Sequence, residues 1–129
     1  MDTWLSLAPP PLWLLRVAVA GVWIYEGLWC KVLGRSQHEL SVVQAVPRYG
    51  ERWGRPFLLA LGWVELGLGL WVLSGRAAAL GALAQTILLV ALNANGLLWS
   101  RRLIDDPGGM LFKNFAFLVL AWTTAGLTT

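Results

Sequence analysis

Charged residues are scarce in this chain. Only 13% of its 129 residues are Asp, Glu, Lys or Arg, whereas 57% are hydrophobic and nine are Trp. Soluble domains have about 25% charged residues. The composition therefore predicts a protein whose outer surface faces lipid. The net charge of +3 is explained below by membrane topology, so it does not indicate nucleic acid as a partner.

Cysteine and histidine are nearly absent. The single cysteine, Cys30, excludes an internal disulfide, a CxxC redox motif and a cysteine-rich metal site. The single histidine, His38, has no second His or Cys nearby, so we predict no metal site. Any redox role must therefore use something other than a dithiol.

The N-terminal segment lacks the features of a cleavable signal peptide. "MDTWLSLAPPP" contains no Lys or Arg and carries an acidic residue, Asp2, whereas signal peptides begin with a basic region. We therefore expect the first apolar segment to be retained as a helix.

Four long apolar windows cover most of the sequence, at about residues 12–33, 56–74, 77–99 and 108–127. Each is near the roughly 20 residues that a helix needs to cross about 30 Å of hydrocarbon. The windows show no alternation of the β-barrel kind, and lipid cannot satisfy an open backbone. The prediction is all-α: an integral membrane four-helix bundle, with residues 1–129 as one domain.

The connections between the windows differ in length. The short "LSGRA" predicts an antiparallel hairpin of the second and third helices. In "SQHELSVVQAVP", Ser36 and Glu39 match a capping box, apolar residues follow at helical spacing, and Pro47 supplies a stop. This pattern predicts a short interfacial helix between the first two spans. At the fourth window, "DDPGG" predicts Asp106 as the N-cap and Pro107 as the first helical residue.

The basic residues predict the orientation in the membrane. Lys and Arg are enriched in cytoplasmic loops, so their distribution between the two sides indicates the orientation. One side carries most of them: Lys31, Arg35, Arg48, Arg52, Arg55, Arg101 and Arg102. The other side has Arg76 in its loop and Arg16 one turn inside the first helix. We therefore predict a multi-pass protein of the cell (inner) membrane with both termini extracytoplasmic.

Polar residues inside the spans gather in the predicted cytoplasmic half. They are Glu26, Glu65, Asn93, Asn95, Lys113 and Asn114. Such groups normally face the bundle interior and mark functional sites. We predict that Glu26 and Glu65 line one pocket with Lys113 and Asn114, the lysine keeping at least one carboxylate charged. The alternative is an ion pair that only fixes helix register.

Three other polar side chains in the spans have simpler interpretations. Arg16 and Lys31 are expected to snorkel to opposite membrane interfaces. Gln85 is expected to form an interhelical hydrogen bond.

Several segments resemble those of the DoxX-like family of small four-helix membrane proteins. They are "RVAVAGVWIYEGLWCKVLG", "HELSVVQAV", "LGWVELGLGLWVL" and "DDPGGMLFKNFAFL". The positions carried over by this resemblance are Tyr25, Glu26, Gly27, Lys31, Glu39, Glu65, Pro107 and Asn114. The resemblance implies a link to quinone-coupled oxidation of sulfur compounds and to membrane oxidoreductase complexes. Cys30 departs from the family pattern, so thiol chemistry is not expected.

Three functions remain open. The first is a small subunit or accessory of a membrane redox system, with a polar pocket for a quinone-like or other small apolar ligand. The candidate residues of this pocket are Trp23, Tyr25, Glu26, Lys31, Glu65, Asn93, Lys113 and Asn114. Trp23 or Trp63 would pack on the ring of the quinone-like ligand. The second is a small proton-coupled transporter, although such four-helix exporters often have a weaker charge bias. The third is a purely structural subunit of a membrane complex.

The sequence does not decide whether the chain is an enzyme or which residues would be catalytic. Soluble cofactor motifs are absent from it, so a redox cycle would need a membrane or soluble redox partner, with quinone as the candidate cofactor. The lipid bilayer is the expected environment. Self-association is left open.

Overall fold

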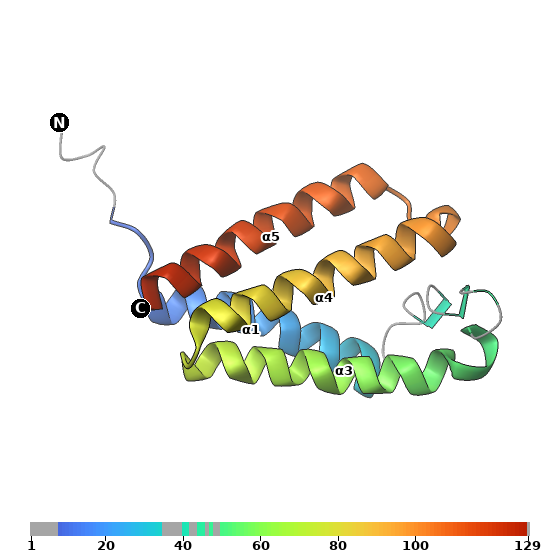
Figure 1. Cartoon of the computed structure of the whole chain (residues 1–129), viewed down its shortest axis with the longest axis horizontal. Coiled ribbons are helices and arrows are strands. Elements are labelled where there is room, and N and C mark those ends of the chain that lie inside the picture. The colour runs from blue at the N-terminus through green and yellow to red at the C-terminus, as the bar shows by residue number, and fades with distance from the viewer. Residues whose placement is uncertain (1–7, 35–39, 42–43, 46, 48–49, 129) are drawn as a thin grey trace.

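Helices make up the secondary structure of the described part of the chain. The computed structural model describes residues 8–34, 40–41, 44–45, 47 and 50–128. In chain order its elements are α1 (Leu12–Ile24), the π-helix η2 (Tyr25–Val32), α3 (Gly50–Ser74), α4 (Ala78–Trp99), the 3₁₀ turn η3 (Arg101–Leu103) and α5 (Pro107–Thr128) (Figure 1). The described residues include no strand, and the predicted all-α fold is confirmed.

Among the described residues, four helices are long and apolar enough to cross a membrane. They span Leu12–Val32, Arg52–Ser74, Ala78–Trp99 and Pro107–Thr128, which agrees with the four predicted windows. The second helix begins earlier than its window, because α3 starts at Gly50 and contains Pro56. Hydropathy marks only the part of a helix that lies in hydrocarbon, and a helix can continue into the polar interface.

The helix ends follow local chemistry. α1 begins after three consecutive prolines, the last of which, Pro11, is its N-cap in an extended conformation. Gly75 and Ala77 both have positive φ in the turn between α3 and α4. At the start of α5, the Gly109 N–H donates a 3.0 Å hydrogen bond to the Asp106 carboxylate. The predicted cap of α5 is therefore confirmed, with Pro107 as the first helical residue. The predicted interfacial helix falls largely outside the described residues.

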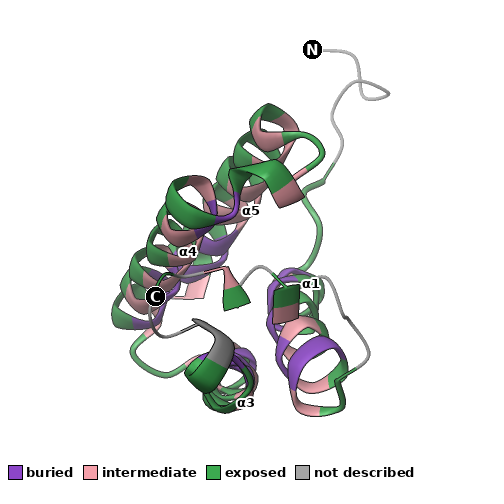
Figure 2. Cartoon of the chain, turned by 90° about the vertical axis from the view of Figure 1, so that its right-hand side faces the viewer, coloured by how far each residue is buried: buried purple, intermediate pink, exposed green. Residues whose placement is uncertain are grey.

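The helices pack as two pairs. α1 and η2 lie along α3, α4 lies along α5, and α1 also contacts α5. The pairs converge at the end where α1 begins, and α4 and α5 lean away from α3 toward the end where η2 lies (Figure 1). Buried residues lie on the sides of the helices that face neighbouring helices, both within the pairs and between them (Figure 2).

Trp23 is the central aromatic residue of the core. It clusters with Val19, Leu68 and Ala121 from three helices, and its ring meets the ring of Phe117 edge-on at 5.7 Å. This core joins the two helix pairs near the middle of the bundle.

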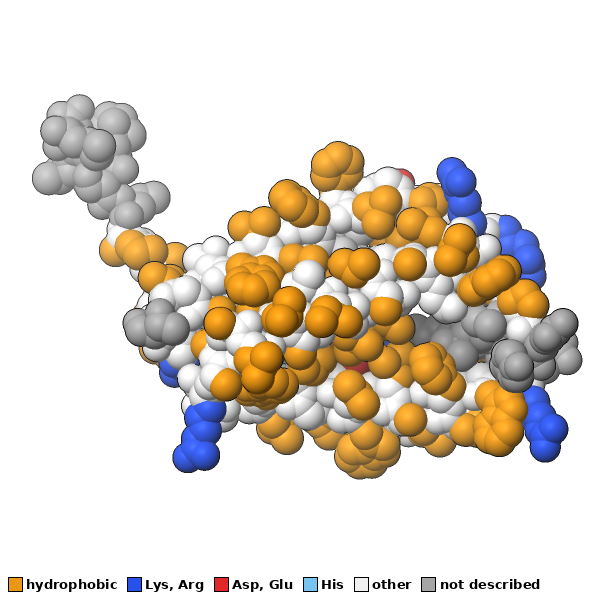
Figure 3. Space-filling model, viewed as in Figure 1, with side chains coloured by type: hydrophobic (Ala, Val, Ile, Leu, Met, Phe, Trp, Pro, Cys, Tyr) orange, Lys and Arg blue, Asp and Glu red, His pale blue; other side chains and the backbone are white. Residues whose placement is uncertain are grey.

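The outer surface is apolar over most of its length. Trp13, Trp63 and Phe112 are 65%, 58% and 78% exposed. Figure 3 shows hydrophobic side chains along the helices and Lys and Arg side chains near the two ends. An apolar surface of this extent is unusual for a monomeric soluble protein. The chain is a multi-pass membrane protein.

Candidate functional site

The first span changes from an α-helix to a π-helix after Ile24. From Tyr25 to Val32 the backbone is a π-helix, in which residues five apart are hydrogen-bonded, as in the 2.9 Å bond from the Leu33 N–H to the Leu28 carbonyl. In an α-helix, residues five apart differ by about 140° around the axis. The π-helical pattern brings such residues onto the same side.

This change places Lys31 beside Glu26, five residues earlier. The Lys31 ammonium donates to the Glu26 carbonyl at 3.4 Å, and its Nζ lies 3.6 Å from Glu26 Oε2. Single-turn π segments inside α-helices frequently occur at functional sites.

Two glycines allow η2 and α3 to approach each other closely. A methyl group at Gly62 would lie 2.8 Å from both the Gly27 carbonyl oxygen and Lys31 Cβ. A methyl group at Gly27 would in turn collide with the backbone of α3, including the Gly62 carbonyl. Small residues at such positions let membrane helices pack backbone to backbone. The lysine of η2 is thereby brought within reach of α3.

Glu65 of α3 is the main partner of Lys31. The Lys31 Nζ lies 2.9 Å from Glu65 Oε1 and donates a 3.1 Å hydrogen bond to Oε2. The side chains of Lys31 and Glu65 are 7% and 2% exposed, whereas that of Glu26 is 38% exposed. We call Glu26, Lys31 and Glu65 the ion triad: a buried ion pair with a second carboxylate at its open edge.

Trp23, Asn93 and Asn114 form hydrogen bonds elsewhere in the bundle. Asn114 donates a 2.8 Å hydrogen bond to Asn93, which joins α5 to α4. Trp23 is buried and donates a 2.8 Å hydrogen bond to Gln85 of α4, which confirms the predicted interhelical bond of Gln85. Tyr25 is 56% exposed.

Two predictions about lysines are wrong. Lys113 is exposed, and within the described part of the chain it forms no ion pair with a carboxylate. Successive helical residues differ by about 100°, so Asn114 faces α4 while its neighbour Lys113 faces away. Lys31 does not snorkel to the interface, because the close approach of η2 and α3 gives its ammonium a buried carboxylate.

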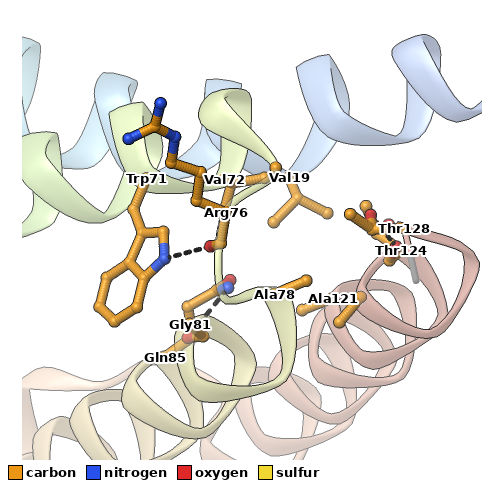
Figure 4. Close-up of a pocket in the computed structure, with 12 residues that line it drawn as sticks. Val19, Trp71, Val72, Arg76, Ala78, Gly81, Gln85, Ala121, Thr124 and Thr128 are labelled. Atoms are coloured by element: carbon orange, nitrogen blue, oxygen red, sulfur yellow. Dashed lines mark hydrogen bonds between the residues drawn. The ribbon is translucent and has the colours of Figure 1, made fainter.

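The structure also has a recess, at the other end of the bundle (Figure 4). It is partly open to the outside and is lined by parts of α1, α3, α4 and α5. Gln85 contributes to its lining, whereas no member of the ion triad does. The recess and the ion triad are therefore separate features of the bundle.

Metal ligands do not gather in the described residues, where no group of three His, Cys, Asp or Glu side chains could hold an ion.

The fold and the ion triad define a four-helix membrane protein with a charged network inside its first two spans. The DoxX-like family matches residues 20–122, and the chain belongs to this family. Searches of curated proteins and of solved structures found no match.

Proposed function

We propose that this chain is a small subunit or accessory of a membrane redox system, and that its ion triad binds the head group of a quinone-like ligand. The observation that carries the proposal is the difference in burial within the triad. Lys31 and Glu65 are almost fully buried, while the Glu26 side chain is 38% exposed. A ligand approaching the bundle could therefore reach a carboxylate that is tied to a buried ammonium.

The chemistry of the triad suits a quinone and its reduced form. An ammonium donates hydrogen bonds to a carbonyl oxygen, and a carboxylate accepts them from a hydroxyl group. Glu26 could take up a hydroxyl proton when a quinol is oxidised and return it on reduction. The electrons would have to pass to a partner, because the sequence has no soluble cofactor motif.

The surroundings of Glu26 supply apolar surface for the rest of such a ligand. Tyr25 and Trp29, on the same π-helix, are 56% and 47% exposed. Aromatic side chains offer flat faces for a ring and apolar contact for an isoprenoid tail.

The alternative, a purely structural ion pair, explains less of the geometry. Lys31 and Glu65 already pair at 2.9 Å, and a buried pair of this kind is sufficient to fix the register of two helices. It gives no reason for a second carboxylate 3.6 Å from the same ammonium. Two like charges near one cation inside a membrane are costly, and intramembrane ionisable groups commonly mark ligand or proton pathways.

Gentle extraction and mass spectrometry test this proposal. The protein is purified in mild detergent, and the lipids, quinones and polypeptides that accompany it are identified and quantified. We expect about one quinone per chain and a redox polypeptide as a partner. Absence of quinone, together with proton-coupled substrate uptake in liposomes, would contradict the proposal and favour a transporter.

A further inference from the structure

The recess at the far end of the bundle has apolar walls. Val19 of α1, Val72 of α3, Ala78 of α4 and Ala121 of α5 line it (Figure 4). Ala125 of α5 belongs to the same lining. The recess is narrow and partly open to the outside. Its walls therefore suit the side of a hydrocarbon chain lying against them better than an enclosed polar molecule.

An arginine with an incomplete set of hydrogen bonds lies at the edge of this recess. Arg16 is one turn before Val19 on α1, and its Nε is buried without a hydrogen-bond partner among the described residues. Its guanidinium lies against Gly75, which lines the recess: a methyl group there would lie 2.9 Å from Nη2. A buried donor without a partner is unfavourable, so an acceptor that reached this guanidinium would stabilise it.

A second arginine is held at the same edge. Arg76 itself lines the recess, and its backbone is fixed in the turn after α3. Its carbonyl accepts a 2.7 Å hydrogen bond from Trp71, and its N–H donates a 3.2 Å bond to Ser74. The Arg76 side chain extends outward from the recess in Figure 4. Neither Arg16 nor Arg76 has a carboxylate partner among the described residues.

We infer that the recess binds an anionic amphiphile, with its phosphate or carboxylate group between Arg16 and Arg76 and part of its hydrocarbon chain against the apolar walls. Guanidinium groups match both of these anions with paired hydrogen bonds. Arg16 lies about one turn inside α1, a depth at which lipid head groups meet the hydrocarbon region. This site is separate from the ion triad and does not depend on the proposed redox role.

Native mass spectrometry of the full chain in a neutral detergent tests this inference. The protein is titrated with phosphatidylglycerol, oleate, phosphatidylcholine and inorganic phosphate. We expect one equivalent of phosphatidylglycerol or oleate to bind, and each to displace the other. Phosphatidylcholine should bind at least tenfold more weakly, and inorganic phosphate alone should not saturate the site. The tighter of the two anionic amphiphiles identifies the source of the anion.

Variants at the head-group position give the second line of the test. Arg76→Gln should weaken binding about fivefold, as expected for one basic residue near a membrane surface. Arg16→Gln should weaken it tenfold or more, because a buried donor is lost as well. Arg16→Lys keeps the charge but loses the planar guanidinium, so its binding affinity should lie between those of the wild type and Arg16→Gln. Arg101→Gln, at the exposed η3 turn on the opposite end, is the matched control and should bind normally.

Variants at the walls test whether the hydrocarbon chain of the ligand lies in the recess. Ala78→Leu should fill the recess and reduce binding, whereas Ala79→Leu, next to it on an exposed position, should not. If Arg101→Gln lost as much binding as Arg76→Gln, the binding would reflect general charge attraction, and the inference would be overturned. Equal binding of phosphatidylcholine, or normal binding by Ala78→Leu, would overturn it as well. Because Arg76 is exposed, its variant remains informative if Arg16→Gln fails to fold.

Discussion

The ammonium of Lys31 lies 2.9 Å from Oε1 of Glu65, although the two residues are 34 positions apart on different spans. Both side chains are almost completely buried. The pair therefore joins the first two spans at a depth where either charge alone would be unfavourable. Glu26 completes the group from the same helix as Lys31.

Lys31→Met should destabilise the protein strongly. It leaves the buried Glu65 carboxylate without its cation, and breaking a buried pair from one side costs about 3–5 kcal/mol. Adding Glu65→Gln should recover part of this loss, since the stranded charge is removed. Thermal and denaturant unfolding in detergent measure both effects. Lys113→Met, at an exposed lysine, is the control and should change little. Strictly additive losses for Lys31→Met and Glu65→Gln would mean that the pair is not coupled.

The ion triad could be predicted only in part from the sequence. The depth of Glu26 and Glu65 in their spans indicated a shared polar region. The cation could not be assigned, because Lys31 lies near the end of its apolar window, where lysines usually snorkel. Its burial depends on a π-helix, for which hydropathy gives no signal.

The glycines between η2 and α3 should tolerate no side chain. Gly27→Ala places a methyl group against the backbone of α3, at the Gly62 carbonyl and the Leu66 nitrogen. The helices must separate, and we expect a loss of about 1–3 kcal/mol with weaker Lys31–Glu65 pairing. Gly67→Ala is the matched control on the same helix pair, because a methyl group there meets nothing within 4 Å. It should be neutral or stabilise by up to about 1 kcal/mol. Equal unfolding curves for the two variants would refute close packing at Gly27.

The buried hydrogen bond from Trp23 to Gln85 should contribute to the free energy of unfolding, because its loss leaves a buried donor unpaired. Gln85→Leu leaves the buried indole N–H without an acceptor, a loss of about 1–3 kcal/mol. Trp23→Phe removes the donor, at the cost of some packing. The double variant should then cost less than the sum of the singles in the same unfolding assay. A sum equal to the double would show that the bond contributes nothing.

Much of the fold, unlike the site, follows directly from composition and spacing. Window length and turn residues predicted four spans, and Asp106 and Pro107 marked the start of α5. The boundary at Gly50 was missed because "GERWGR" is too polar to register as a span, although it continues α3. Lys113 was assigned to the interior on depth alone, whereas its neighbour Asn114 takes the face toward α4.

The orientation of the chain is a prediction that labelling can measure. In a Cys30→Ala background, single cysteines are introduced at Ala8 and at Asp105, on exposed positions at opposite ends of the bundle. Because basic residues favour the cytoplasm, an impermeant thiol reagent should label Ala8→Cys in intact cells. It should label Asp105→Cys only after the membrane is opened. The reverse pattern would place both termini in the cytoplasm.

Binding of a short-chain quinone to Glu26→Gln is the most direct test of the ion triad as a ligand site. The affinity is measured by quenching of tryptophan fluorescence in detergent, and stability is followed in parallel. Asp105→Asn, which neutralises an exposed carboxylate on the segment between η3 and α5, is the control. We predict that Glu26→Gln weakens binding tenfold or more, about 1.4 kcal/mol, while its melting temperature stays close to wild type because Glu26 is partly exposed. Wild-type affinity in Glu26→Gln, or no saturable binding to the unmodified chain, would contradict the account.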